Sequence, residues 1–589
     1  MVLKAEKRQT SRSACKATGV FYTPEPIVNY ILEHTLAKHD VVTNPAPRVL
    51  DPACGSGNFL VAAYDLLWIK FTTNLALLRR RYGRHQYTVK NGNSETRLTG
   101  IQYWQPENLP YHIIRSCLYG ADVDADAVAA ARIRLAEKGA GTVVVAEDQL
   151  LVCDSLIKWE RPEQADNYDP QSSQSKLAAR FWGQEFDYIV GNPPYISFGL
   201  NRVGKMPVDQ AEYLRRNYPH SAQYKLSYYA IFFERSIQAL KTGGYLGFIT
   251  PDSYLLGRYY SKIREYIMKT CSIQAISLVR SKLFTGVLVG IPAITILKKV
   301  TQDIAGTEVT ISKIDNSGIS IDTYQYEQQY FSRQVYNRFR LFFHATDKIL
   351  IDKIEQAPYL FKDLTKTRTG MRSLTTQADI KGKTKLGPTW QRGLISSGQV
   401  LPFCLNYQGD WLDINPDKLN KGGWNAAVIA GPKIVLRQTG DSLIATIDRS
   451  GLYHLNNIHS LVPSREGVSL EFLACILNSK LMNYYYHTIT LEKGRPMAQV
   501  DIETVEKLPL VTHPHYMDKL EKLGLKLTQL SNSVCCNSLE RRNETGAISE
   551  LTALFNEMNA LVYSLYGLSD SEIGYIEQAE INMEKFYKK

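Results

Sequence analysis

FDYIVGNPPYISF, residues 186–198, is the most informative stretch of this 589-residue sequence. Its apolar run at 188–190 is too short for a helix and predicts a buried parallel strand. The two prolines that follow cannot donate hydrogen bonds to a sheet, so the strand ends before them. Asn192 and Tyr195 are therefore expected at the carboxyl edge of the sheet, where open α/β folds place their ligands.

Asn192, Pro193 and Tyr195 suit one kind of chemistry. An exocyclic amino group on a base is a poor nucleophile, because its lone pair is delocalised into the ring. The side-chain oxygen of Asn192 and the carbonyl of Pro193 can accept from its two N–H bonds, and the ring of Tyr195 can stack on the base. Such a base must first be flipped out of a duplex. A plain strand-to-turn junction is the alternative, because Asn-Pro and Pro-Pro are common turn dipeptides.

The composition limits the class of protein. The length predicts two or three domains, and the formal net charge of +11 is consistent with a polyanionic partner. The nine cysteines form no C-x-x-C set with zinc-like spacing, and Cys535 and Cys536 suit neither a structural disulfide nor a metal site. The N-terminus has no signal-peptide core, and no apolar stretch is long enough to span a membrane. We therefore expect a cytoplasmic protein with neither a metal nor a membrane partner.

A glycine turn between a strand and a helix is the second informative feature. Residues 48–51 predict a short strand, DPACGSGNF supplies Gly55 and Gly57, and an apolar helix starts at Phe59. This order is typical of nucleotide binding, because glycines let a ligand approach the backbone. The turn is neither a GxGxxG motif nor a P-loop, so its signal is weak when taken alone.

Acidic residues lie at the ends of two further predicted strands. In residues 118–124, Asp122 lies where a ribose hydroxyl pair would bind, whereas Asp124 is expected to cap the following helix. Residues 149–159 predict a third strand with Asp154 near its end. Asp154 can accept from the amino group of an adenine ring, or it can be an ordinary turn aspartate.

The segments after residue 222 complete an α/β pattern. They predict a helix at 226–240, capped by residues 242–244, and strands at 245–251, 273–280 and 291–297. Strands that alternate with helices indicate a mostly parallel sheet. The last two strands are closely spaced and predict an antiparallel edge.

The pattern changes after about residue 325, which predicts a division into domains at 1–325 and 326–589. The second part begins as a β-rich module and becomes helical from about residue 513. Within the first part, residues 77–112 are interpreted as an insertion, and Thr23 is expected to be the N-cap of an early helix.

The ordered set FYTP, DPACGSGNF, GADVD, CDSL and GNPPY, followed by a long C-terminal part, resembles the gamma-ordered N6-adenine DNA methyltransferases, the class of the TaqI methyltransferase. GPKIVLRQTGDSLIAT, NNIHSLVP and KGRPMAQV resemble the TaqI-like specificity domain. The resemblance implies a Rossmann-like, S-adenosylmethionine-dependent methyltransferase sheet and a mixed α+β DNA-recognition domain. It also implies methyl transfer to N6 of a flipped adenine in double-stranded DNA, as the modification partner of a bacterial restriction-modification system.

The same resemblance implies roles for single residues. The cofactor-binding set is Thr23, Asp51, Ala53, Gly55, Gly57, Asp122 and Asp154. The residues that hold or stack the target adenine are Asn192, Pro193, Tyr195 and, in the turn KLFTG, Phe284, which could instead be an ordinary apolar turn residue. Candidate DNA contacts in the C-terminal domain are Arg437, Gln438, Lys493 and Arg495. Arg437 can instead support the core of that domain.

Other functions share parts of this pattern. N4-cytosine methylation usually has Ser in place of Asn192, and protein glutamine methyltransferases are shorter and lack a large C-terminal module. RNA methylation fits the same site chemistry. A bifunctional enzyme is expected to carry a nuclease domain ahead of FYTP, and only 18 residues precede Gly19. We therefore expect any cognate restriction endonuclease to be a separate protein, and the sequence indicates neither the recognition site nor the oligomeric state.

Overall fold

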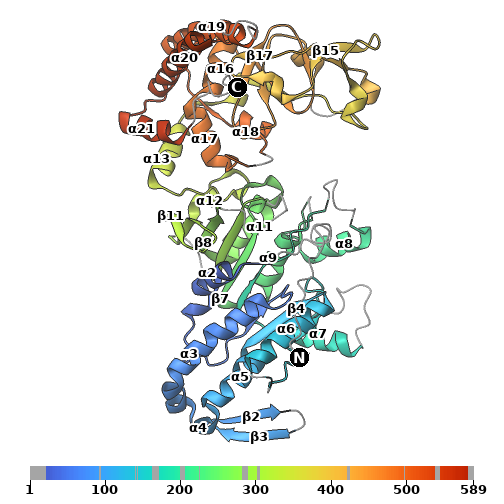
Figure 1. The fold of residues 1–589 in the computed structure, drawn as a ribbon, viewed down its shortest axis with the longest axis vertical. Helices are drawn as coiled ribbons and strands as arrows, with labels where there is room; N and C mark the ends of the chain where they lie inside the picture. The colour runs from blue at the N-terminus through green and yellow to red at the C-terminus, as the bar shows by residue number, and fades with distance from the viewer. Residues whose placement is uncertain are drawn as a thin grey trace. The chain divides into compact units, whose positions relative to one another are not determined.

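The computed structural model divides into two compact units, Met1–Phe343 and His344–Lys589 (Figure 1). This division lies beyond the expected boundary at 325/326, because the chain after residue 325 still packs on the sheet of the first unit, as in the contact of Tyr326 with Phe342. The described residues are 22–91, 94–139, 141, 143–161, 172–198, 206–223, 226–280, 290–301, 306–420, 425–495, 498–536 and 544–580.

The first unit is built on a nine-stranded mixed sheet with the order β11-β10-β8-β9-β7-β6-β1-β4-β5. The neighbouring strands β7, β6, β1, β4 and β5 are all parallel to one another. Their bounds are β1 Val49–Asp51, β4 Leu118–Asp122, β5 Leu150–Val152, β6 Phe186–Gly191 and β7 Leu240–Pro251. The remaining strands are β8 Cys271–Val279, β9 Pro292–Lys299, β10 Glu308–Ile314 and β11 Ser320–Glu327.

Short apolar strands are buried on both faces, as parallel sheets require. Every residue of β1 is buried, and five of the six residues of β6 are. One hydrophobic core joins the sheet to three helices, which are α2 (Glu25–His34), α3 (Asn58–Tyr82) and α6 (Ala125–Lys138). Another helix, α9 (Tyr228–Ala239), is buried along almost its whole length.

The predicted antiparallel pair exists, but its predicted place at the edge of the sheet is wrong. Strand β9 pairs antiparallel with β8 on one side and with β7 on the other, so it lies inside the sheet. Strand β10 then adds parallel to β8, and β11 closes the edge as an antiparallel strand. The sequence signal for β11 is weak because this strand is mostly exposed.

Two predicted caps are also corrected. Residues 242–244 do not cap α9; they lie within β7, which begins directly after the helix at Leu240. Thr23 is not the N-cap of α2, since Pro24 holds that position, and the hydroxyl of Thr23 accepts from the side chain of Asn192 instead. The predicted cap at Asp124 is confirmed, because its carboxylate accepts from the backbone of Asp126 and Ala127.

The predicted insertion at 77–112 packs as an aromatic cluster at the far end of α3. It contains the hairpin of β2 (Gln86–Asn91) and β3 (Ser94–Thr99), which Figure 1 shows beside that end of the helix. Trp104 is fully buried there, and the rings of Tyr87 and Tyr103 stack at 4.0 Å. The insertion therefore extends the core of the first unit beyond the far end of α3.

The second unit combines small sheets with helices. Its larger sheets have the orders β13-β22-β19-β20 and β14-β18-β15-β21. The strands of the first are β13 Thr365–Thr369, β22 Ile458–Pro463, β19 Lys433–Arg437 and β20 Ala445–Asp448. Those of the second are β14 Lys381–Gly382, β18 Trp411–Asp413, β15 Trp390–Leu394 and β21 Tyr453–His454. Its helices include α13 Ala345–Ile354, α16 Leu470–Asn478, α17 Lys480–Thr490, α19 Pro514–Cys536, α20 Glu544–Leu565 and α21 Asp570–Ala579. The last three lie in the segment that was predicted to be helical, from about residue 513.

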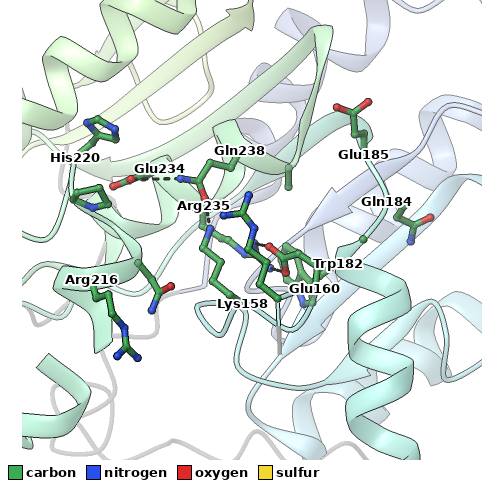
Figure 2. A pocket seen from close by; sticks show the side chains of 15 residues that line it. Lys158, Glu160, Trp182, Gln184, Glu185, Arg216, His220, Glu234, Arg235 and Gln238 are labelled. Atoms are coloured by element: carbon green, nitrogen blue, oxygen red, sulfur yellow. Dashed lines mark hydrogen bonds and ion pairs between the residues drawn. The ribbon is translucent and has the colours of Figure 1, made fainter. Parts of the chain in front are cut away.

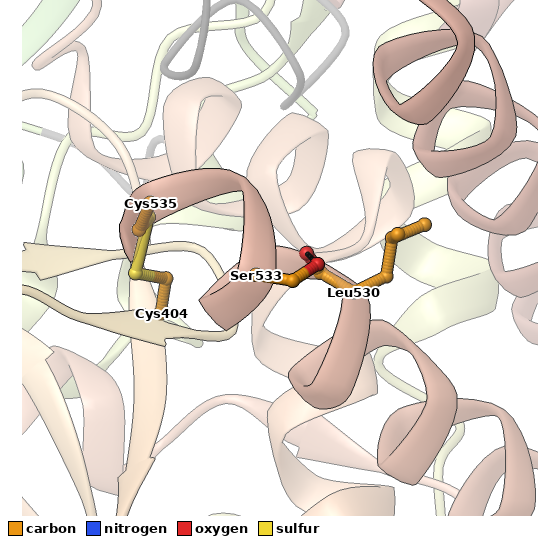
Figure 3. The surroundings of a disulfide bond; sticks show 4 residues. All are labelled: Cys404, Leu530, Ser533 and Cys535. Atoms are coloured by element: carbon orange, nitrogen blue, oxygen red, sulfur yellow. Dashed lines mark hydrogen bonds between the residues drawn. A yellow bond between two sulfur atoms is a disulfide. The ribbon is translucent and has the colours of Figure 1, made fainter. Parts of the chain in front are cut away.

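Cys535 forms a disulfide with Cys404, which lies in β17 (Cys404–Leu405) (Figure 3). The expectation that Cys535 suits no disulfide is therefore wrong. The two residues are 131 positions apart, and only the packing of α19 near β17 brings them together.

Within the ranges that the structure describes, no helix has both the length and the apolar character needed to cross a bilayer. The same residues contain no group of three or more His, Cys, Asp or Glu side chains arranged to hold a metal ion.

Candidate active site

Those predicted site residues of the first unit that the structure describes gather at one edge of the sheet. Strands β5, β4, β1 and β6 are neighbours in this order and run parallel. Their carboxyl ends therefore lie side by side, and the chain leaves them through Asp154, Asp122, Asp51 and Asn192. The sheet brings together residues that the sequence spreads over more than a hundred positions.

The glycine turn after β1 is held against the end of β4. Gly55 and Gly57 have positive φ angles of 48° and 84°, which favour glycine. The backbone N–H of Gly55 donates to Oδ2 of Asp122 at 2.8 Å. A Cβ at Gly57 would lie 3.0 Å from the Cβ of Ala131 in α6, whereas a Cβ at Gly55 would meet nothing within 4 Å. The turn is therefore tight on its helix side and open where a ligand could approach.

Asp51 is a buried carboxylic acid at the centre of this edge. It is 2% exposed, and its Oδ1 accepts from the backbone N–H of Ala53 at 3.1 Å. Burial raises the pKa of Asp51 to about 8, and the nearby charge of Asp122 adds to the shift. A carboxyl with so high a pKa gains strongly from a cationic neighbour, which would favour its ionised form.

Gly191 explains how Asp51 and the end of β6 fit together. A Cβ at Gly191 would lie 2.6 Å from Oδ1 of Asp51, which is well inside van der Waals contact. Any larger residue directly before Asn192 would therefore require the buried side chain of Asp51 to shift. This close contact was not predicted, because a glycine at the end of a strand has no distinctive sequence pattern around it.

Asp154 stands beside a small cavity. The cavity has a volume of about 160 Å³, and its lining residues are Asp154, Leu156, Ile157, Asp209, Gln210, Tyr213 and Leu214. Burial raises the pKa of Asp154, and its Oδ1 accepts from the backbone N–H of Leu156 at 2.9 Å. An apolar lining with a few polar groups is typical of small-molecule sites. The part of the lining supplied by α8 (Val208–Asn217) was not predicted.

The hydroxyl of Thr23 orients the side chain of Asn192. Nδ2 of Asn192 donates to Oγ1 of Thr23 at 3.0 Å, and Thr23 is 3% exposed. Since a carboxamide is planar, its oxygen then points away from Thr23. This contact joins the segment before α2 to the end of β6, across 169 positions of sequence.

Tyr195 and Pro193 lie in the short segment that follows β6. Pro193 is buried and Tyr195 is half-buried. The hydroxyl oxygen of Tyr195 is buried, and burial raises the pKa of its phenol. The segment is then held at Ser197, whose hydroxyl lies 2.7 Å from that of Ser227. Phe284, the predicted second stacking residue, lies outside the described residues.

The four candidate DNA contacts have partners within the second unit. Nε of Arg437 donates to the carbonyl of Val400 at 2.6 Å, which fits its alternative role in the core. Gln438 bonds Gln499, and Nη1 of Arg495 lies 2.7 Å from Oε1 of Glu492. Nζ of Lys493 lies 3.1 Å from Oε1 of Glu580, although 43% of the lysine side chain is exposed.

Three family models match the chain. Residues 8–90 match the N-6 DNA Methylase model, and residues 116–284 match the Eco57I restriction-modification methylase model. Residues 394–510 match the TaqI-like C-terminal specificity domain. The chain therefore carries N6 adenine methylase domains and a TaqI-like C-terminal domain, and the resemblance stated from the sequence is confirmed.

Curated relatives are type II restriction-modification methyltransferases. The type II restriction enzyme and methyltransferase RM.Eco57I of Escherichia coli is 27% identical over 267 residues, covering 42% of this chain and 24% of that protein. The type II methyltransferase M.PaeR7I of Pseudomonas aeruginosa is 25% identical over 300 residues, covering 51% and 43%. M.BstVI of Geobacillus stearothermophilus is 26% identical over 309 residues, covering 50% and 46%. The chain spans less than half the length of each of these relatives.

Solved structures share the fold. The type IIL restriction-modification enzyme MmeI in complex with DNA matches with a TM-score of 0.59 at 13% identity, over 98% of this chain and 80% of that one. The DrdV–DNA complex matches with a TM-score of 0.54 at 10% identity, over 89% and 58%. At this level of identity, the likeness concerns the fold alone.

Gly191→Ala is expected to lower the free energy of unfolding by about 1–3 kcal/mol, because the added Cβ overlaps Oδ1 of Asp51. Gly546→Ala is the matched control, since a Cβ there meets nothing within 4 Å and Gly546 lies in α20. The control should raise stability by up to about 1 kcal/mol. Urea unfolding of both variants measures the difference, and equal stabilities would contradict the close approach of Gly191 to Asp51.

Proposed function

We propose that this chain, in which N6 adenine methylase domains precede a TaqI-like C-terminal domain, is the DNA methyltransferase of a bacterial restriction-modification system. It transfers a methyl group from S-adenosylmethionine to N6 of an adenine flipped out of double-stranded DNA. One observation carries the proposal most strongly: Asn192 lies on the same sheet edge as Asp51, Asp122 and Asp154. Groups for a cofactor and for a base nitrogen are thus neighbours.

The residues around the glycine turn fit S-adenosylmethionine. When bound, this cofactor supplies a methyl group on a sulfonium, which is the electrophile for the amino nitrogen. The carboxyl of Asp51, with its raised pKa, suits the positive charge of such a ligand. Asp122 accepts from Gly55 and Asp124 and retains lone pairs for ribose hydroxyls. The cavity beside Asp154 offers an acceptor for the amino group of an adenine ring.

The side-chain oxygen of Asn192 and the carbonyl of Pro193 act on the target nitrogen by accepting hydrogen bonds from its two N–H groups. Two acceptors pull the nitrogen from a planar toward a tetrahedral shape, which frees its lone pair for attack. Thr23 supports this role, because it binds the amide nitrogen of Asn192 and so fixes which way the oxygen points. Catalysis is then mainly positioning together with hydrogen bonds that strengthen as the nitrogen becomes positive.

Tyr195 stacks on the extruded adenine, since its half-buried ring follows Asn192 by three positions. Phe284 is the proposed residue on the opposite face of the base. In the second unit, the TaqI-like domain reads the target sequence. Lys493 is the candidate phosphate contact with the most exposed side chain, which is 43% exposed. A cognate restriction endonuclease acting on the same site is the proposed partner.

Asn192→Ala is expected to reduce methyl transfer by at least about 100-fold, because the lost acceptor stabilises the developing positive charge on nitrogen. The affinity for S-adenosylmethionine should stay close to that of the wild type. The assay follows transfer of a tritiated methyl group from the cofactor to unmethylated genomic DNA, and isothermal titration follows cofactor binding.

Asn74→Ala is the control, since Asn74 lies on α3 and bonds only a carbonyl of its own helix among the contacts described for it, at Lys70. It should transfer methyl groups at the wild-type rate. Full activity of Asn192→Ala would contradict the role of Asn192, and transfer to RNA or protein but not to DNA would contradict the substrate.

Binding of S-adenosylmethionine at about pH 6.5 is expected to release up to about one proton, because Asp51 is mostly protonated below its pKa and a bound cation favours its ionised form. Affinity should therefore rise between about pH 6 and pH 8. Isothermal titration in buffers with different ionisation enthalpies measures the proton count.

Asp51→Asn should bind without this proton release, whereas Asp65→Asn, which removes an exposed partner of Lys138, should retain it. A wild-type protein that binds the cofactor with no proton release would show that Asp51 has the same protonation state with and without the ligand, and this would contradict its ionisation on binding.

A further inference from the structure

A second and larger cavity lies in the first unit, next to a buried group of charged side chains. Its volume is about 680 Å³, and Lys158, Glu160, Glu234, Arg235 and Gln238 are among its lining residues (Figure 2). Neutral side chains join these charged groups by hydrogen bonds. Lys158 bonds Gln238, which also donates to Oε1 of Glu234 at 3.4 Å, and Oε2 of Glu234 accepts from the hydroxyl of Ser221 at 2.6 Å. These contacts indicate a network that stabilises the protein itself.

Arg235 is the centre of this network. The residue lies in α9 and is 2% exposed. Its Nη1 and Nη2 donate to the two carboxylate oxygens of Glu160 at 2.6 and 2.9 Å, in the bidentate geometry that makes such pairs strong. The guanidinium also lies over the ring of Trp182, with its carbon 4.2 Å from the ring centroid (Figure 2).

The remaining hydrogen bonds of Arg235 go to the backbone of the loop after β5. Nε donates to the carbonyl of Ser155 at 2.9 Å, and Nη2 donates to that of Ile157 at 3.4 Å. Together with Glu160, these acceptors all belong to residues 155–160. One buried side chain therefore fixes the path of the loop that starts at Asp154.

Two tyrosines and a serine fix the same loop from other directions. The hydroxyl of Tyr218 donates to the carbonyl of Leu156 at 2.6 Å, and the hydroxyl of Tyr213 accepts from the N–H of Lys158 at 2.8 Å. Oγ of Ser155 donates to the carbonyl of Pro52 at 2.6 Å, which ties the loop to the glycine turn. Leu156 and Ile157 also line the cavity beside Asp154.

We propose that Arg235 is a positioning residue for the cofactor site: from α9, it holds residues 155–160 in the conformation that shapes the cavity beside Asp154. This proposal rests on the proposed function, because it assigns that cavity to the adenine ring of S-adenosylmethionine. A loop that is already ordered does not lose conformational entropy when the ligand binds, so preorganisation increases affinity. Arg235 touches neither reacting group, and it affects binding far more than the chemical step.

Arg235→Lys in the full chain tests the proposal. Lysine keeps the charge but cannot reproduce the bidentate pair together with the bonds to the two carbonyls. The dissociation constant for S-adenosylmethionine, measured by isothermal titration, should rise by about tenfold or more. The rate of methyl transfer at saturating cofactor should change little. Hydrogen exchange of the backbone amides of residues 155–160 in the ligand-free protein should become faster.

Arg264→Lys is the matched control. Arg264 is fully buried in α11 (Ser261–Thr270) and also donates to backbone carbonyls, but these belong to Tyr254, Gly257, Tyr336 and Asn337. It should lose stability as Arg235→Lys does, and yet keep the wild-type affinity and the wild-type exchange at 155–160. If Arg235→Lys does not fold, Tyr218→Phe removes one bond to the loop, and a smaller rise in the dissociation constant is expected.

Equal cofactor affinities of Arg235→Lys and Arg264→Lys, with normal binding by the wild type, would overturn the positioning role alone. A rise in both dissociation constants by the same factor would also overturn it, because the effect would then follow from general destabilisation. A folded wild-type protein that does not bind S-adenosylmethionine would instead contradict the proposed function, and the role of Arg235 with it.

Discussion

Parallel pairing of β5, β4, β1 and β6 is the constraint on which the site depends. In a parallel sheet all strands end at the same edge, so the order of four neighbouring strands fixes which residues can meet. Asp154, Asp122, Asp51 and Asn192 each leave a strand at this edge. The close approach of Gly191 to Asp51 then sets the distance between the ends of β6 and β1. A shift of β6 by one residue would reverse the direction of every side chain in it.

The site holds two buried carboxyls whose ionised form the folded protein disfavours. Burial raises the pKa of Asp51 and of Asp154, so each carboxyl is more easily ionised in water than in the folded protein. Such groups are typical of functional sites, because a ligand can supply the missing charge or donor. The buried arginine at the other cavity differs, since Glu160 and nearby carbonyls already compensate its charge. The first unit therefore contains two buried carboxyls that a cationic or hydrogen-donating ligand would favour, and also a buried arginine whose charge is compensated within the protein.

Sequence reasoning predicted much of the first unit, because its signals are local. The strand before the two prolines, the glycine turn and the cap at Asp124 each follow from a short pattern. The errors have a different origin. Thr23 resembles a helix cap, but its hydroxyl binds Asn192 across 169 positions, and Cys535 finds its partner 131 positions away. The close approach of Gly191 to Asp51 and the hydrogen bonds of Arg235 were missed for the same reason. They join segments that are distant in the sequence, and no short motif indicates such contacts. Strand β11 was missed because a mostly exposed edge strand has little apolar pattern. Strand β10 is more buried and lies inside the sheet, and the sequence analysis did not identify it.

The most direct test is base-modification sequencing of genomic DNA from a methylation-deficient bacterial host that expresses the full chain. The account predicts N6-methyladenine at one short sequence motif, and its absence in DNA from a host that expresses the Asn192→Ala variant. A modified cytosine at one motif would retain the fold but contradict adenine as the target. The absence of any modified base, from a folded protein that binds S-adenosylmethionine, would contradict DNA as the substrate.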